Sequence, residues 1–134
     1  MIRSRASRRE GFSVLEALMT LTILALAAAL IMPSAAGLLD RMTAHAVFFE
    51  FQRQVTDLRR QAYAAQTPVV LVDAGRRDGV TIDLRSGWSY RLDRPMTISA
   101  GGACRPAEVL VLKSDRPVMR LVPGPDPCRF VRTN

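Results

Sequence analysis

Hydrophobic residues follow one another from Phe12 to Leu39, and Glu16 is the only charged side chain among them. A run of this length is typical of a helix that crosses a membrane. The 21 residues from Phe12 to Met32 make a helix of about 31 Å, which matches the ~30 Å hydrocarbon core of a bilayer. Pro33 then marks a place where the span could end or kink. We therefore expect a transmembrane helix over residues 12–39.

The pattern changes at Asp40, where apolar residues begin to recur every three or four positions. This period predicts an amphipathic continuation of the helix over residues 40–67, because Pro68 disfavours helical backbone at Thr67. Charged residues occupy the other side, at Glu50, Arg53, Asp57 and Arg60. The apolar face that we expect to be buried consists of Ala44, Phe48, Phe51, Val55, Leu58, Ala62 and Ala65.

Short β-branched and apolar runs, separated by turn residues, make up residues 68–134. The runs cover residues 68–72, 80–84, 88–92, 96–99, 107–112, 118–122 and 129–132. Short strands with this punctuation indicate an antiparallel sheet, or two. A long helix followed only by strands predicts an α+β fold in which the sheet covers the apolar face of the helix.

The 134-residue chain has a formal net charge of +7, and its amino-terminal leader is basic. Four arginines (Arg3, Arg5, Arg8, Arg9) stand against Glu10 before the span. Positive charge beside a span favours the cytoplasmic side. We expect the amino end in the cytoplasm and residues 40–134 outside.

Two cysteines, Cys104 and Cys128, both fall in the expected external part. An oxidising compartment favours a disulfide between them, and two unpaired buried thiols are the alternative. A metal site is not expected, since His45 is the only histidine and lies far away in the sequence. We find no nucleophile–base arrangement and no phosphate loop, so the chain is not expected to be an enzyme or to need a cofactor.

The start of the chain resembles the class III signal of type IV pilins and type II secretion pseudopilins. The resemblance rests on a basic leader ending in Gly11, on Phe12 after it, on Glu16, and on a long apolar helix with Pro33 inside it. It implies a pilin-like fold. It also implies that a prepilin peptidase removes the leader, residues 1–11, and methylates the new amino terminus at Phe12. An ordinary cleaved secretory signal is the alternative, with Ala35-Ala36-Gly37 as its site, but its apolar region would be about half this length.

Glu16 has two readings. The carboxylate could reach headgroup water from a position near the interface and have no further role. The resemblance instead implies that it pairs with the amine of Phe12 on a neighbouring subunit and sets the register of a helical filament. In hydrocarbon such pairing relieves the burial cost of both charges.

The end of the helix is similar to the H-type minor pseudopilins and the related FimT-like pilins. The matching residues are Arg59, Ala62 and the strand at 68–71, whereas Leu58 departs from the small residue usual there. The major pseudopilin is a poorer match, because Asp115 and Asp126 are isolated and calcium needs six or more oxygens. The K-type tip subunit usually lacks an acid at the position of Glu16.

The resemblance implies a structural subunit of the periplasmic pseudopilus of the type II secretion system. Its partners would be other major and minor pseudopilins, the prepilin peptidase and an assembly platform in the bacterial inner membrane. A FimT-like minor pilin that binds DNA for uptake is the alternative. The net positive charge allows it, with Arg129 and Arg132 near the carboxyl end.

Overall fold

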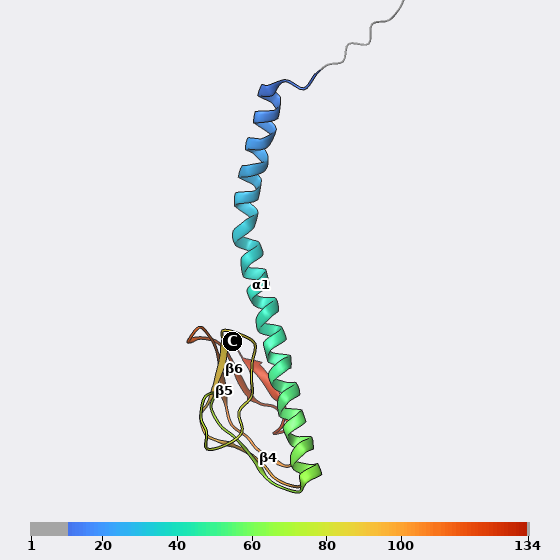
Figure 1. The fold of residues 1–134 in the computed structure, drawn as a ribbon, viewed down its shortest axis with the longest axis vertical. Coiled ribbons are helices and arrows are strands. Elements are labelled where there is room, and N and C mark those ends of the chain that lie inside the picture. Colours follow the sequence, from blue (N-terminus) through green and yellow to red (C-terminus); the bar gives the residue numbers. More distant parts are fainter. Residues whose placement is uncertain (1–10, 134) are drawn as a thin grey trace, which may run out of the picture. The chain divides into compact units, whose positions relative to one another are not determined.

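The computed structural model describes residues 11–133, without the side chains of residues 33–36. The chain divides into two compact units, Met1–Asp40 and Arg41–Asn134. One helix, α1 (Val14–Ala65), belongs to both units, and all seven strands follow it (Figure 1). The expected α+β layout, one long amino-terminal helix packed with antiparallel sheets, is therefore present.

The first unit consists of the apolar part of α1 and the residues before it. Ser13 caps the helix, because its hydroxyl accepts a hydrogen bond from the Leu15 N–H (3.2 Å) and its carbonyl accepts one from the Ala17 N–H (3.0 Å). The large apolar side chains from Phe12 to Met32 are all exposed. By length and composition α1 can cross a membrane, as expected.

In the second unit α1 ends in a Schellman turn at Gln66. The Thr67 N–H donates to the Ala62 carbonyl (3.2 Å) and the Gln66 N–H donates to the Tyr63 carbonyl (3.3 Å). Gln66 has φ 52°, a left-handed conformation that usually falls to glycine. The side-chain amide nitrogen of Gln66 also donates to the Tyr63 carbonyl, at 2.7 Å, and so adds a hydrogen bond to the turn.

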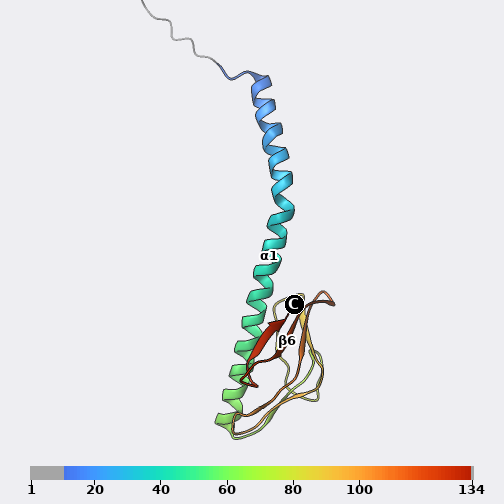
Figure 2. The same ribbon diagram turned by 180° about the vertical axis from the view of Figure 1, so that it is seen from behind.

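Two antiparallel sheets follow the helix. The first contains β1 (Val69–Leu71), β3 (Met96–Ile98) and β4 (Cys104–Arg105), in the order β1-β3-β4. The second contains β2 (Trp88–Leu92), β5 (Val109–Lys113), β6 (Arg116–Pro123) and β7 (Phe130–Thr133), in the order β2-β5-β6-β7. The last strand lies beside α1 in both views (Figure 1 and Figure 2).

The strand expected over residues 80–84 is wrong. Only Val80 pairs, in a single parallel bridge with Leu71. The Ile82 N–H instead bonds to the side-chain hydroxyl of Tyr90 at 2.9 Å, so this segment is held by a side chain rather than by a ladder. The sequence also did not predict β4, whose two residues follow a turn closed by the Ser99 N–H on the Ala103 carbonyl (2.8 Å).

The core lies between α1 and the two sheets. Five of the seven expected helix positions are buried, but Phe48 is only partly buried and Ala65 is exposed. Val47 is fully buried in their place. The observed face steps by three or four residues through Ala44, Val47, Phe51, Val55, Leu58 and Ala62. Phe51 makes edge contacts with Tyr90 of β2 (5.4 Å) and Phe130 of β7 (5.5 Å).

Side chains cap the edges of the four-stranded sheet. Asp73 accepts the Leu92 N–H of β2 at 2.7 Å. At the other edge, the Gln52 side chain of α1 accepts the Phe130 N–H (2.8 Å) and donates to the Cys128 carbonyl (3.0 Å). These bonds satisfy edge groups that would otherwise invite another strand.

Tyr90 is the polar centre of the core, since its hydroxyl also donates to the Val72 carbonyl at 2.7 Å. We predict that Tyr90→Phe lowers the free energy of unfolding by about 1–3 kcal/mol, because a buried N–H and a buried C=O lose their partner. Burial raises the pKa of Tyr90 above its usual value. Stability of the wild type should therefore fall as the pH rises above about 10, and Tyr90→Phe should lessen that fall.

Denaturant titration of the full chain in detergent, followed by the fluorescence of Trp88, measures both effects. Tyr63→Phe is the matched control, since Tyr63 is exposed, and it should change neither quantity. Equal stabilities for the two variants would contradict the role given to Tyr90.

Candidate processing and assembly site

The expected cleavage site lies outside the helix. Residues 11–13 have no regular structure and precede α1 directly. Phe12 is 78% exposed, and a Cβ added at Gly11 would meet nothing within 4 Å. A protease needs a substrate bond that is accessible and outside a helix, and the bond between Gly11 and Phe12 has both properties.

Glu16 lies in the first turn of α1, four residues after Phe12, and is exposed. Its carboxylate makes no hydrogen bond or ion pair with the part of the chain that the structure describes. The positive end of the helix dipole favours an acid here by a fraction of a kcal/mol. Ser13 and Glu16 also have the spacing of a capping box, a signal in the sequence that could have placed the helix start.

The two threonines of the apolar stretch donate hydrogen bonds to backbone carbonyls of their own helix. Thr20 donates to the Glu16 carbonyl at 2.9 Å, and Thr22 donates to the Leu18 carbonyl at 2.7 Å. In hydrocarbon such bonds remove most of the cost of a hydroxyl. Among the polar side chains of this stretch that the structure describes, Glu16 is thus the one that still needs a partner.

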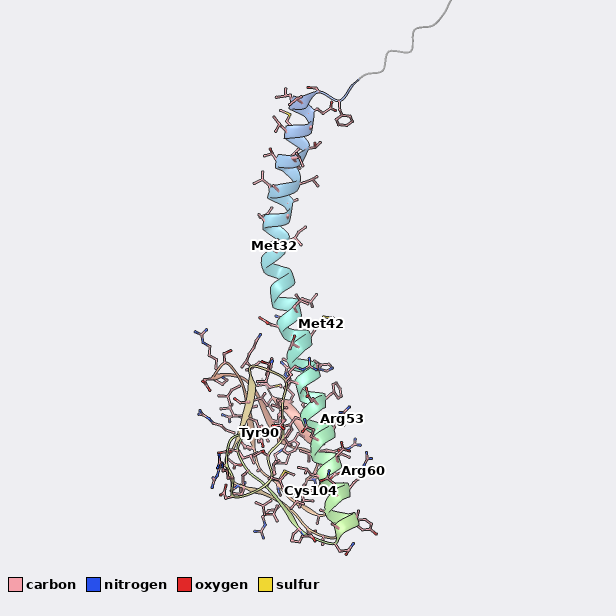
Figure 3. All side chains as sticks on the ribbon, viewed as in Figure 1. Met32, Met42, Arg53, Arg60, Tyr90 and Cys104 are labelled. Atoms are coloured by element: carbon pink, nitrogen blue, oxygen red, sulfur yellow. A yellow bond between two sulfur atoms is a disulfide. The ribbon has the colours of Figure 1, made fainter. Side chains whose placement is uncertain are left out.

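The expected disulfide between Cys104 and Cys128 is present, with a Cα–Cα distance of 5.3 Å. It joins β4 to the loop before β7, and Cys104 is labelled in Figure 3. Asp126 in the same loop lies 3.6 Å from Arg59 of α1. Gly102, with φ 83°, packs where a Cβ would come within 3.3 Å of the Arg59 Nε. Helix, β4 loop and β7 loop therefore meet around Arg59.

The two arginines considered for DNA binding are not equally available. Arg129 is exposed in the bend before β7, whereas Arg132 lies within β7 on the side of buried Phe130 and is only partly exposed. Arg76 forms a hydrogen-bonded ion pair with Asp78, so this turn is internally neutralised. Among residues 11–133, no group of three or more histidine, cysteine or carboxylate side chains is placed to hold a metal ion.

His45 is exposed on α1, with its ring 4.7 Å from that of Phe49. A comparison of the chain with protein-family models, curated proteins and solved structures finds no match.

We predict that Cys104→Ser lowers the free energy of unfolding by about 3 kcal/mol. The disulfide spans a sequence separation of 24. Closing a loop of this length lowers the conformational entropy of the unfolded chain by an amount equivalent to about 3 kcal/mol. A reducing agent should destabilise the wild type by the same amount and leave Cys104→Ser unchanged. Labelling of both thiols in native, non-reduced protein would show instead that no disulfide forms.

Proposed function

We propose that this protein is a minor pseudopilin, a structural subunit of the periplasmic pseudopilus of a type II secretion system. A prepilin peptidase cleaves it after Gly11 and methylates Phe12. The apolar part of α1 anchors the subunit in the inner membrane, with the leader in the cytoplasm and the second unit in the periplasm. From there it joins other pseudopilins through an assembly platform.

One observation carries this proposal: an accessible glycine–phenylalanine bond stands just before a membrane-length helix whose first turn holds an unpaired acid. Each part has a separate use in the proposed life of the subunit. The exposed bond is the substrate of the peptidase, and the apolar helix is the anchor. Cleavage creates a charged amine at Phe12, and the carboxylate of Glu16 is the group that pairs with such an amine. An acid costs about 2.5–3.5 kcal/mol at the centre of a membrane helix on insertion scales. The cost is lower in the first turn, where Glu16 lies, but the helix dipole returns only a fraction of a kcal/mol, so a plain anchor gains little from this acid.

A FimT-like minor pilin that binds DNA is the second candidate, and the partial burial of Arg132 weakens it. Retention of the full chain on DNA separates the candidates. A pseudopilin should elute at physiological salt, whereas a DNA-uptake subunit should stay bound and show a steep dependence on salt.

We predict that Gly11→Val leaves the leader attached, because a branched side chain would obstruct the bond that the peptidase must reach. The uncleaved chain should remain in the membrane with its second unit folded. Amino-terminal sequencing of the wild type should find Phe12 first. A mature protein that begins elsewhere would refute the assignment of the cleavage site.

We predict that Glu16→Leu inserts, is cleaved normally and folds, since the core of the second unit contains none of residues 12–40. It should lose efficient incorporation into the filament, because the amine of Phe12 on an adjacent subunit loses its carboxylate. Crosslinking to other pseudopilins and a secretion assay, run beside the processing assay, measure this. Glu16→Gln is the matched control for size and should share the defect; normal crosslinking and secretion by both variants would falsify the pairing role.

A further inference from the structure

The outer side of α1 in the second unit carries exposed apolar residues that are separated by multiples of seven positions. Met42, Phe49 and Tyr63 are 62%, 56% and 63% exposed, the highest values among the large apolar residues of that unit. They are separated by seven and fourteen positions. At 100° per residue they lie on the side of α1 opposite the buried face through Phe51.

The residues between these three positions continue the same seven-residue repeat along the outer side of α1. Steps of four and three connect these residues into one continuous seam, which we call the outer seam: Met42, Ala46, Phe49, Arg53, Thr56, Arg60 and Tyr63. Figure 3 shows Arg53 and Arg60 projecting from the side of α1 away from Tyr90. Such alternation of three and four is the pattern by which one helix packs along another.

The seam is shaped to receive a side chain. Ala46, Phe49 and Arg53 line a hollow together with Glu50 and Arg85. Phe49 is exposed but held in place by edge contacts with the rings of His45 (4.7 Å) and Phe48 (5.3 Å). An aromatic ring fixed beside a small residue loses little freedom on contact, which is the usual character of an interface anchor.

The charges on the seam disfavour a second copy as its partner. Copies anchored in the same membrane direction would align in parallel, and equivalent seam positions would then face each other. Arg53 would meet Arg53 and Arg60 would meet Arg60, so like charges would oppose the pair. Arg60 has an exposed contact to Asp57 at 3.6 Å, whereas Arg53 has no ion pair among the residues that the structure describes.

We infer that the outer seam is a docking surface for a helix of a different subunit, one that presents carboxylates to Arg53 and Arg60 and apolar side chains to Phe49 and Tyr63. The two arginines then select an acidic partner and reject self-pairing. This inference rests on the proposed function for the parallel alignment and deepens it by naming the partner's chemistry.

The first experiment uses the full chain alone in lipid vesicles, with the photocrosslinker p-benzoylphenylalanine in place of Phe49. With both arginines present, we expect no homodimer adduct. Arg53→Leu/Arg60→Leu should yield a homodimer adduct at least tenfold above that level, because the seam becomes apolar and loses its repulsion. Arg77→Leu/Arg105→Leu removes the same charge elsewhere and should yield none. A homodimer adduct with the native arginines, or none with the leucine pair, overturns the inference.

The second experiment places the same crosslinker in cells that hold the other assembly subunits. Mass spectrometry of the adduct should identify a helical segment of a different subunit with an aspartate or glutamate within four residues of the crosslinked position. Arg53→Glu/Arg60→Glu should abolish the adduct, Arg53→Lys/Arg60→Lys should keep it, and exchange of the partner's carboxylates for arginine should restore it. An adduct to a loop, a strand or lipid, or one insensitive to charge reversal, overturns the inference.

Cleavage after Gly11 is scored in the same samples, because it does not depend on the seam. A processed protein without an adduct at Phe49 overturns the docking surface and leaves the proposed function standing. An unprocessed wild type counts against the proposed function itself.

Discussion

The contact of Phe51 with two aromatic rings holds the second unit together. Tyr90 and Phe130 lie on β2 and β7, the two outermost strands of a four-stranded sheet. In a flat sheet such strands would be about 14 Å apart, yet both rings reach one phenylalanine and so lie at most about 11 Å from each other. The side chains of the two edge strands therefore converge on Phe51 of α1, and truncation of Phe51 would remove a contact from both edges at once. A change of this kind in a packed core costs about 3–5 kcal/mol.

The same helix meets opposite demands along its length. Its first part is apolar on every side, which suits lipid and gives no preferred face. From Arg41 onward one face is consumed by the core, the flanks carry charge, and the outer seam remains. Lipid stabilises apolar surface equally on every side of a helix. Only the second unit can therefore specify the face on which a neighbouring subunit binds. That division suits the proposed role, in which the anchor moves in the membrane before the subunit is fixed in a filament.

The sequence predicted those features that depend on local pattern. The helix, the strands around Tyr90 and Val111, and the disulfide follow from periodicity, β-branched runs and compartment. It could not predict that Ile82, in a segment that alternates as a strand does, would donate its N–H to the hydroxyl of Tyr90, because that partner is set by tertiary packing. The choice of Val47 over Phe48 depends on where the sheet lies around the helix. The outer seam was readable as a seven-residue repeat, but only burial of the other face shows that it is unused.

Gln52 has a mechanical consequence. The side-chain amide of Gln52 bonds to the edge of β7 as a neighbouring strand would, and it joins the helix to the sheet through two hydrogen bonds. Apolar contacts alone would allow the two surfaces to slide over each other, because they are not directional. A tensile load along α1 would therefore pass through these bonds to β7, and the loop before β7 is fastened in turn to β4 by the disulfide. The subunit can be drawn by its helix as a single piece, with the load shared by a covalent bond two residues from the point where the helix grips the strand.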